Sequence, residues 1–336
     1  MSITARELAK KLNISASAVS LALNNKPGVS YETRKTVIQT AEHYGYDFTK
    51  LSKNKSVNGR SIYFILYKRH GAVVVNDSSF FAQLSIGIEE SCKEFKIKLQ
   101  TIYLSKSDDV HRQLEDIIYA GCMGIILLGT EMLPDDLTAF VKLSVPVVLL
   151  DVYYDTIKYS CISINNVQGA FLATDYLITK TKTQPGLLHS TYKTANVDER
   201  ADGFYKAVRE HGLSTSKSIV HRLTHSADGA FADMLAILDS GEDIASSYFA
   251  VCDWIAIGAM KAFQARGKKI PDDVAIIGFS DLSVAEFIDP PLTTIRIDAR
   301  FMGEIAAKHL IGVINVKEQT QIKIEIMTNL IIRGSV

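Results

Sequence analysis

The chain has 336 residues, of which 47% are hydrophobic, and its acidic and basic residues balance to a formal net charge of zero. This composition excludes a largely disordered chain, and the length accommodates one small and one large domain. The sequence has no apolar N-terminal leader and no run long enough to span a bilayer. Its four cysteines are scattered without paired spacing, as is usual for reduced, buried thiols. We therefore expect a cytoplasmic globular protein.

Three short helices are predicted near the N-terminus, each with its own start signal. Thr4 and Glu7 form a capping box, in which each side chain pairs with a backbone N–H of the first turn. Ser15 and Ser30 are favourable N-caps for two further helices. Apolar residues at helical spacing would let the three helices bury one another, namely Leu8 and Leu12, then Val19, Ala22 and Leu23, then Val37, Ile38, Ala41 and Tyr44. The pattern predicts a small all-α helix-turn-helix domain over residues 1–47.

The second of these helices is the predicted reader of DNA. Ala16 and Ser17 lie at its start, and recognition helices address base edges from their N-terminal residues. Leu21 follows Ser17 by one turn on the same face. Polar side chains and backbone N–H groups at helix starts are expected to bind phosphates, which fixes register rather than sequence. The predicted DNA contacts are Thr4, Ser15, Ala16, Ser17, Ser20, Leu21, Asn24, Asn25 and Lys55.

The charge distribution supports a DNA-binding head. Residues 1–60 hold ten Lys or Arg against four Asp or Glu, a net charge of +6, so the rest of the chain carries −6. A basic head on an acidic body favours contact with DNA through the head alone. The alternative is a helical domain whose basic surface is only solvated. Residues 48–60 are polar, basic and poor in large apolar groups, and they are predicted to form a hinge or linker.

From Ser61 onward, strand-like apolar runs alternate with helical patterns in two successive arrays. Continuous apolar strands are typical of a parallel sheet that is covered on both faces. Two βαβ arrays predict two Rossmann-like α/β lobes, and ligands bind such lobes at the carboxyl ends of strands. The predicted strands are 61–67, 97–103, 124–129 and 145–151 in the first array, and 186–190, 218–223, 247–252 and 273–279 in the second.

Two segments resemble the lac-repressor family of bacterial transcription regulators. One is the head segment SASAVSLALNNKPGVSYETRKTVIQTAEHYGY, and the other contains PDDVAIIGFSD and PPLTTI, which are highly specific as a pair. The resemblance implies a periplasmic-binding-protein-like core over residues 61–336. It also implies three crossings between the lobes, near 163–166, 290–293 and 320–323. Lobe 1 would then comprise about 61–163 and 293–321, and lobe 2 about 164–292 and 322–336.

The head and hinge depart from the family's usual pattern at two places. Many relatives carry Arg at the position of Leu21, where Arg can read guanine, whereas Leu21 would more readily touch a thymine methyl group. The family's hinge usually has a Pro at the position of Phe48 and, further on, a Leu that wedges into the minor groove at the position of Lys55. A lysine can neutralise phosphate but cannot unstack bases. The resemblance therefore leaves open whether the hinge orders and kinks the DNA.

Candidate effector contacts are polar residues that follow strands, together with positions that match the family's motifs. Asp151, Asp253 and Asp281 each follow a predicted strand. The resemblance implies binding roles for Arg200, in an Arg-x-x-Gly-Phe element, for Asp253, in the family's Asn-Asp-x-x-Ala motif, and for an aromatic pair. The full set is Phe80, Phe81, Asp151, Arg200, Asp253, Trp254 and Asp281.

These residue types suit a sugar, although several have structural alternatives. A carboxylate and a guanidinium can each bind neighbouring hydroxyls with two charge-assisted hydrogen bonds, and an aromatic ring can cover the apolar face of a pyranose. Asp151 could instead cap a loop, Phe81 could belong to the core, and Asp281 could be structural. Trp254 could stack on a ligand or begin a helix in the core.

Catalytic motifs are absent from the sequence. It contains no GxSxG, GxxxxGK[ST], HExxH or complete GxGxxG. His221 and His225 are four residues apart, but their segment resembles a strand rather than a helix that could present both to a metal. We therefore expect no catalytic residue, no metal site, no cofactor and no enzyme activity.

The main hypothesis is a transcriptional repressor that binds a pseudo-palindromic operator as a homodimer. Its operator affinity would be set by a sugar or sugar derivative bound between the lobes. The alternative partner is a phosphorylated carrier protein of sugar transport, and a third hypothesis is an enzyme or transport receptor. Because the chain ends at Val336 without heptad repeats, a dimer is expected rather than a tetramer.

Overall fold

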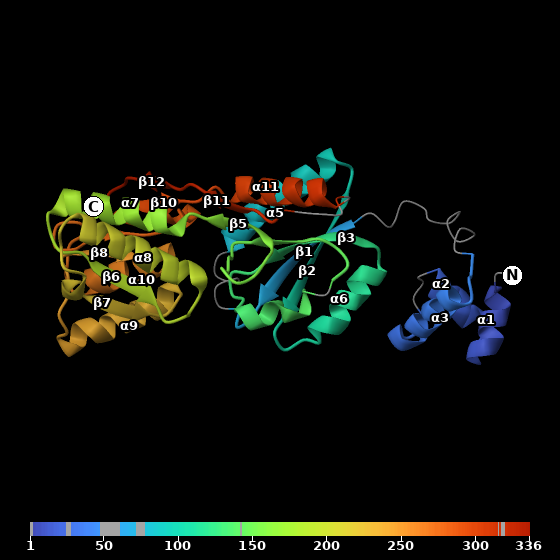
Figure 1. Ribbon diagram of the computed structural model, residues 1–336. Coiled ribbons are helices and arrows are strands. Elements are labelled where there is room, and N and C mark those ends of the chain that lie inside the picture. The colour runs from blue at the N-terminus through green and yellow to red at the C-terminus, as the bar shows by residue number, and fades with distance from the viewer. Residues whose placement is uncertain are drawn as a thin grey trace.

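The computed structural model describes residues 3–24, 28–47, 61–71, 78–141, 143–314, 316 and 320–336. Figure 1 shows three bodies in a row, with the N-terminal helices at one end and a lobe of mixed helices and strands at the other. The proposed hinge of residues 48–60, including Lys55, lies outside the described residues, as does Asn25.

The head contains the three predicted helices, α1 (Ala5–Leu12), α2 (Ala16–Leu23) and α3 (Tyr31–His43). Thr4, Ser15 and Ser30 are their N-caps, and the capping box of Thr4 with Glu7 is complete. Their buried residues form one small core: Leu8, Ala9, Val19, Ala22, Val37 and Ala41. Two predicted inward residues lie outside this core. Ile38 is half-buried. Tyr44 is 40% exposed and lies beneath the ammonium of Lys11, 4.0 Å from its ring centroid. Tyr46 packs against this core instead.

Lobe 1 is built on a six-stranded parallel sheet in the order β11-β5-β4-β3-β1-β2. Its strands are β1 (Ser61–Lys68), β2 (Lys98–Ser105), β3 (Cys122–Leu128), β4 (Val147–Leu150), β5 (Ser160–Ile164) and β11 (Lys323–Ile326). Successive residues of β1 bury opposite faces: Phe64 packs in the cluster that includes α5 (Ser78–Glu94) and α11 (Ala299–Val313). Ile65 packs in the cluster that includes α6 (Val110–Tyr119) and the 3-10 helix η2 (Pro134–Ala139). This two-sided burial explains the continuous apolar strands.

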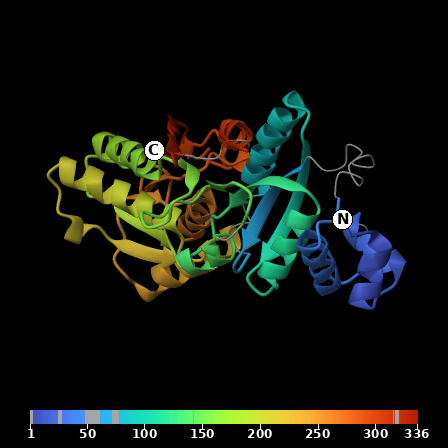
Figure 2. The same cartoon turned by 45° about the vertical axis from the view of Figure 1, so that its right-hand side comes forward.

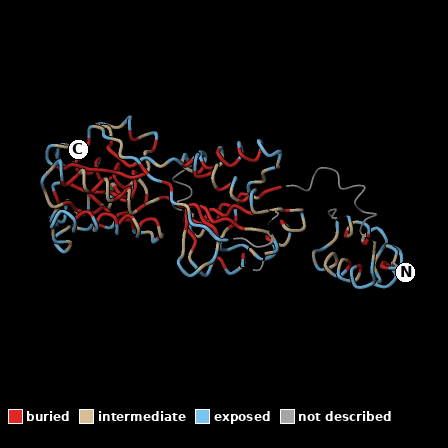
Figure 3. The backbone as a smooth tube through the Cα atoms, turned by 45° about the horizontal axis from the view of Figure 1, so that its top comes forward, coloured by how far each residue is buried: buried red, intermediate tan, exposed pale blue. Residues whose placement is uncertain are grey.

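Lobe 2 is built on a four-stranded parallel sheet in the order β7-β6-β8-β9. The strands are β6 (Gly186–Ser190), β7 (Val220–Leu223), β8 (Ser247–Ala250) and β9 (Ala275–Ile277). The helices are α7 (Asn166–Thr181), α8 (Ala195–Glu210), α9 (Ala227–Ser240) and α10 (Asp253–Ala265), with short 3-10 turns η3 (Thr215–Lys217) and η4 (Ser283–Glu286). Figure 3 shows buried residues running through the strands of both lobes.

A close helix pair positions the side chains that matter below. Helices α7 and α8 pack so tightly that a Cβ on Gly203 would lie 2.4 Å from the carbonyl oxygen of Val167. Only glycine permits this approach. The tight packing places the first turn of α7 against the middle of α8, next to the crossing from lobe 1.

Three segments connect the lobes, and two of them lie later in the chain than predicted. The first leaves β5 at Ile164 and enters α7 at Asn166. The predicted second crossing at 290–293 is wrong, because β10 (Thr294–Arg296) pairs with β12 (Asn329–Ile331) and Thr293 bridges Ile277 of lobe 2. The predicted third crossing at 320–323 is also wrong, because β11 pairs with β5 and the chain crosses only between β11 and β12. Figure 2 shows the lobes and their connections from a second direction.

Candidate functional site

The predicted DNA-reading residues lie on the surface of the head. Ala16, Ser17 and Ser20 of α2 are exposed, and Leu21 is half-buried. Ser15 and Ser17 share a hydrogen bond of 2.8 Å between their Oγ atoms, and the backbone N–H of Ala18 donates to Ser15 Oγ at 3.0 Å. The start of α2 is therefore rigidly capped and open to a groove, as a recognition helix requires.

Two further predicted DNA contacts already make hydrogen bonds within the head. The hydroxyl of Thr4 donates to Glu7 Oε2 at 2.7 Å, and Asn24 Nδ2 donates to the carbonyl oxygen of Ser20 at 2.8 Å. The backbone N–H of Thr4 and its hydroxyl lower the pKa of Glu7. Both side chains are exposed, so their contacts with phosphate remain predictions.

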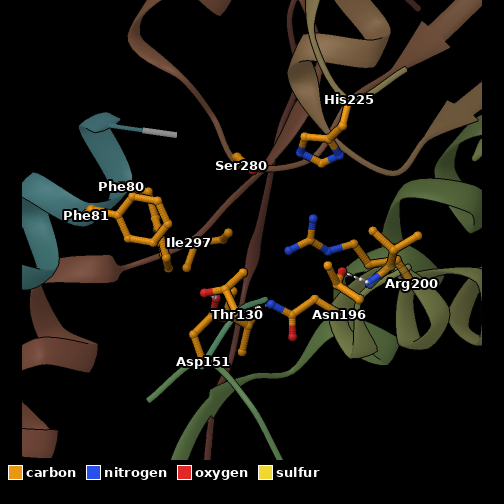
Figure 4. Close-up of a pocket in the computed structure, with 12 residues that line it drawn as sticks. Phe80, Phe81, Thr130, Asp151, Asn196, Arg200, His225, Ser280 and Ile297 are labelled. Carbon is orange, nitrogen blue, oxygen red and sulfur yellow. Dashed lines mark hydrogen bonds between the residues drawn. The ribbon is translucent and has the colours of Figure 1, made fainter. Parts of the chain in front are cut away.

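A small pocket with a cavity volume of about 30 Å³ lies between the two lobes. Figure 4 shows that side chains from both lobes converge on it. Lobe 1 contributes Phe80 and Phe81 of α5, together with Thr130 and Asp151 just beyond β3 and β4, and lobe 2 contributes Asn196 and Arg200 of α8, His225 beyond β7 and Ser280 beyond β9. The mixture of apolar walls with a few polar groups is typical of a small-molecule site.

Asp151 is the acidic group of this pocket and joins the two lobes. Its backbone has a positive φ of 61°, which turns the side chain away from the strand direction at the end of β4. One carboxylate oxygen accepts a hydrogen bond from the Thr130 hydroxyl at 2.6 Å, and the other accepts one from Asn196 Nδ2 at 3.0 Å. Burial raises the pKa of Asp151 to about 6, against the lowering effects of Thr130, Arg200 and Asn196. The carboxylate is thus held in place across the cleft.

Arg200 is the basic group of the pocket and is only 6% exposed. Its Nε donates to Asn166 Oδ1 and its Nη1 donates to the carbonyl oxygen of Val251, both at 2.8 Å. The guanidinium also stacks on the ring of Phe279, 3.9 Å from the centroid. These contacts fix the plane of a group that can donate several hydrogen bonds.

His225 forms another polar part of the wall and is neutral at neutral pH. Burial and, next, the positive charge of Arg200 lower the pKa of His225 to about 4. Its Nδ1 lies 3.3 Å from Ser190 Oγ. A neutral imidazole offers one donor and one acceptor, which suits a hydroxyl-bearing ligand.

Three predicted effector residues do not line the pocket. Asp253 is fully buried within lobe 2, where it accepts hydrogen bonds from Thr294 Oγ1 at 2.6 Å and from the backbone N–H of Leu282 at 2.8 Å. Asp281 forms ion pairs with Arg296 and Arg333 at 2.6 and 2.7 Å. Trp254 packs half-buried against the main core. The structural alternatives therefore describe Asp281 and Trp254, and the binding role predicted for Asp253 is replaced by a structural one.

The sequence analysis did not identify several residues that line the pocket, although the spacing or position of some of them indicates a role there. Asn196 lies four residues before Arg200, on the same face of α8, so the helical spacing could have indicated it. Thr130 follows the apolar strand β3, and Ser280 directly precedes Asp281. His225 was weighed only as a metal ligand with His221, which lies on β7 instead of in the pocket.

Comparisons with known proteins agree with this architecture. The family model of the periplasmic binding protein-like domain matches residues 174–336. The HTH-type transcriptional repressor PurR of Pasteurella multocida is 27% identical over 99% of this chain and 98% of its own length. The chain is therefore similar over nearly its whole length to an HTH-type transcriptional repressor. None of the relatives named here is described as bound to a carrier protein, so that alternative gains no support from them.

Solved structures of transcription regulators share the fold of this chain over its whole length. A complex of the transcriptional regulator CelR with cellobiose aligns with a TM-score of 0.73 at 22% identity, over 99% of this chain and 100% of the other. The lac repressor dimer bound to operator and the anti-inducer ONPF aligns with a TM-score of 0.70 at 19% identity, over 100% and 99% of the two chains. At these identities the likeness concerns the fold. No helix in the described ranges of the chain is long and apolar enough to cross a membrane.

Proposed function

We propose that this chain is a transcriptional repressor of the LacI family, whose affinity for an operator is set by a sugar or sugar derivative bound between its lobes. The observation that carries the proposal is the convergence of Asp151 from lobe 1 and Arg200 from lobe 2 on one pocket, in a chain that begins with a capped helix-turn-helix. The relatives named as HTH-type repressors support the DNA-binding output. The relative bound to cellobiose supports the sugar class.

The pocket chemistry favours a neutral, hydroxyl-rich ligand. Its wall combines one carboxylate, one guanidinium and a neutral imidazole, so its charges nearly cancel at neutral pH. Hydroxyl groups of a sugar can both donate to Asp151 and accept from Arg200, in the stronger class of hydrogen bonds. Phe80 and Phe81 supply an apolar wall for the ring face.

Ligand binding would act on DNA through the relative positions of the lobes. The effector contacts side chains from both lobes, so it has different affinities for closed and open arrangements, and this difference shifts the equilibrium between them. Lobe 1 carries the head, and a dimer would present two heads to the two half-sites of a pseudo-palindromic operator. We also propose that the protein has no enzymatic activity and acts in the cytoplasm, where its DNA target lies.

A thermal-shift panel on the full chain tests the proposal, with sugars, sugar phosphates and nucleobases as probes. A ligand at about 100 times its dissociation constant adds roughly 2.7 kcal/mol of stability, which raises the melting temperature by a few degrees for a chain of this size. The Arg200→Ala variant should lose the response. Arg266→Ala is the matched control, because Arg266 forms an exposed ion pair with Asp239.

Operator binding is tested separately by selecting duplexes from a random pool with the full chain. A pseudo-palindromic consensus and a dimeric complex are expected. A panel without any sugar response, or a chain that stays monomeric on its selected duplex, would contradict the proposed function.

A further inference from the structure

Asn166 lies where the first crossing from lobe 1 enters lobe 2. It is the first residue of α7, directly after the N-cap Asn165, and is only 1% exposed. The backbone N–H of Asn165 donates to the carbonyl oxygen of Ile326 at 3.0 Å. The first and third crossings therefore run side by side at this point, and Asn166 is anchored to the connection between the lobes.

The side-chain amide of Asn166 contacts three residues of α8. Its Oδ1 accepts the hydrogen bond from Arg200 Nε at 2.8 Å. Its Nδ2 donates to Asn196 Oδ1 at 3.2 Å and to Glu199 Oε2 at 2.8 Å. Asn196 in turn donates from its own Nδ2 to Asp151 at 3.0 Å. One amide at the crossing thus supports the basic group of the pocket directly and the acidic group through Asn196.

The partners of Asn166 fix the orientation of its amide. Arg200 can only donate a hydrogen bond, and an ionised Glu199 can only accept one. A flip of the amide would place donor against donor and acceptor against acceptor, so both contacts would be lost. In the observed orientation, Asn196 Oδ1 accepts a hydrogen bond from Asn166 Nδ2. The other end of the Asn196 amide, Nδ2, is then directed at Asp151.

We propose that Asn166 is a positioning residue for the effector pocket, which orients the Arg200 guanidinium and, through Asn196, the Asp151 carboxylate. This inference deepens the proposed function and rests on it for its biological meaning, because a fixed pair of pocket groups binds ligand with less loss of side-chain freedom. The hydrogen bonds themselves exist without any ligand, so the inference is tested independently of effector and operator.

No other common side chain reproduces this arrangement. Ala removes all three contacts of the amide. Asp retains acceptors for Arg200 but has no donor for Asn196 or Glu199, and it adds a negative charge beside Glu199. Gln is longer by one methylene in a buried setting. The Ala and Asp variants therefore separate the support of Arg200 from the support of Asn196.

The first experiment follows the Arg200 Nε–Hε signal by NMR in the full chain labelled with ¹⁵N-arginine. The signal is assigned by its disappearance in Arg200→Lys. We expect the Nε–Hε proton of Arg200 to exchange with solvent about tenfold faster in Asn166→Ala, because a hydrogen bond to a charged group is lost. Asn166→Asp should keep slow exchange, since the acceptor remains.

Asn165→Ala is the matched control on the neighbouring residue. Asn165 Oδ1 caps α7 by accepting from the backbone N–H of Gln168 at 3.0 Å and does not line the pocket. Its loss should cost stability and leave the Arg200 exchange rate unchanged. Equal exchange rates in wild type and Asn166→Ala, or faster exchange in Asn165→Ala alone, would overturn the proposal. If Asn166→Ala does not fold, faster exchange in Asn166→Asp would contradict it.

The second experiment titrates the Asp151 carboxyl by ¹³C NMR in the same variants. Asn196 lowers the pKa of Asp151, while among the nearby charges Arg200 lowers it and Glu199 raises it. Misdirection of Asn196 should therefore raise the pKa of Asp151 in both Asn166 variants. The pKa should stay at its wild-type value in Asn165→Ala. An unchanged pKa in both Asn166 variants would show that Asn166 does not act on the acidic group. If both NMR experiments give the expected results but no sugar shifts the melting temperature, the proposed function is contradicted and the positioning role of Asn166 is not.

Discussion

Asp151 and Asp253 are buried carboxyl groups, one in each lobe, with different roles. Each directly follows a buried strand region, β4 for one and β8 with its two-residue extension for the other. Both are almost completely buried, and burial raises the pKa of each to about 6. Asp151 faces the pocket and accepts a hydrogen bond from the opposite lobe. Asp253 accepts its hydrogen bonds from Thr294 and Leu282 within its own lobe.

The difference shows that burial and a raised pKa do not by themselves identify a ligand contact. What separates the two carboxylates is the origin of their partners. Asp253 lies so close to Gly278 that a Cβ on Gly278 would be 2.1 Å from Asp253 Oδ1. The carboxylate is therefore tightly enclosed by residues of its own lobe. Asp151 accepts a hydrogen bond from Asn196 across the cleft, where a ligand can compete with Asn196 for the carboxylate. We therefore expect Asp253 to contribute to stability and propose that Asp151 contributes to ligand recognition.

The largest expected effect is the loss of stability in Asp253→Ala. This substitution leaves the Thr294 hydroxyl and the Leu282 N–H unpaired in the core and opens a cavity, which should cost roughly 3–5 kcal/mol. Urea unfolding of the full chain measures it, with the exposed Asp239→Ala as control. Asp151→Ala should cost about 1–2 kcal/mol, because pocket water can replace the carboxylate. Equal losses in the free energy of unfolding for Asp253→Ala and Asp151→Ala would contradict the different roles of the two carboxylates.

The pH dependence of stability should reveal the buried carboxyl of Asp253. Its pKa is raised from 3.8 unfolded to about 6 folded, so the folded state binds the proton more tightly. This contribution is fully present below pH 3.8 and is lost as the pH rises through about 6. His225 acts in the opposite direction, because its pKa falls from 6.5 to about 4.

A comparison of wild type with Asp253→Asn isolates the carboxyl from the histidine. The stability of wild type minus that of the variant should fall by up to roughly 3 kcal/mol between acid and neutral pH. Urea unfolding at several pH values gives this difference. A difference that stays flat across this range would mean that Asp253 does not titrate with a raised pKa.

Asp151→Asn should act on ligand binding more than on stability. The amide keeps the shape of the carboxylate but loses its charge and one acceptor, so a bound sugar should lose about 10- to 100-fold in affinity. Calorimetric titration with the sugar that gives the largest thermal shift measures this. Asp253→Asn serves as the matched control and should bind that sugar with wild-type affinity. If only Asp253→Asn binds the sugar more weakly, Asp253 rather than Asp151 contributes to sugar binding.

The smallest expected effects come from the two threonines that donate to these carboxylates. Thr130→Val and Thr294→Val remove hydroxyls that lie 2.6 Å from Asp151 and Asp253 respectively. Each should cost about 1 kcal/mol of stability, but only Thr130→Val should also weaken sugar binding. A change in sugar affinity of the same size in Thr294→Val would show that the two carboxylates are coupled.

The head could be predicted almost residue by residue, because helix caps are local signals. Thr4, Ser15 and Ser30 begin the three helices as the sequence indicates. Tyr44 was placed inside because its spacing is helical, but as the C-cap of α3 it turns outward. The exposed reading surface of α2 follows from the same local pattern.

The pocket could be predicted only in part, because side-chain direction depends on loops and on the opposite lobe. Asp151, Arg200 and the aromatic pair were found from their place after strands or from motifs. Asp253 has the same sequence context as Asp151, and only the tertiary structure shows that it points away from the pocket. Two of the three crossings were misplaced for a related reason, since the pairings of β11 with β5 and of β10 with β12 are contacts between short strands.

The most direct test of the central claim measures operator affinity of the full chain against the concentration of a pocket-binding sugar. We expect the wild-type chain to change its affinity for the selected operator by about tenfold or more, as a coupling of about 1–3 kcal/mol implies. The Arg200→Ala variant should bind the operator without responding to the sugar. A sugar that binds the wild-type pocket and leaves its operator affinity unchanged would contradict the account, as would an equal response in Arg200→Ala.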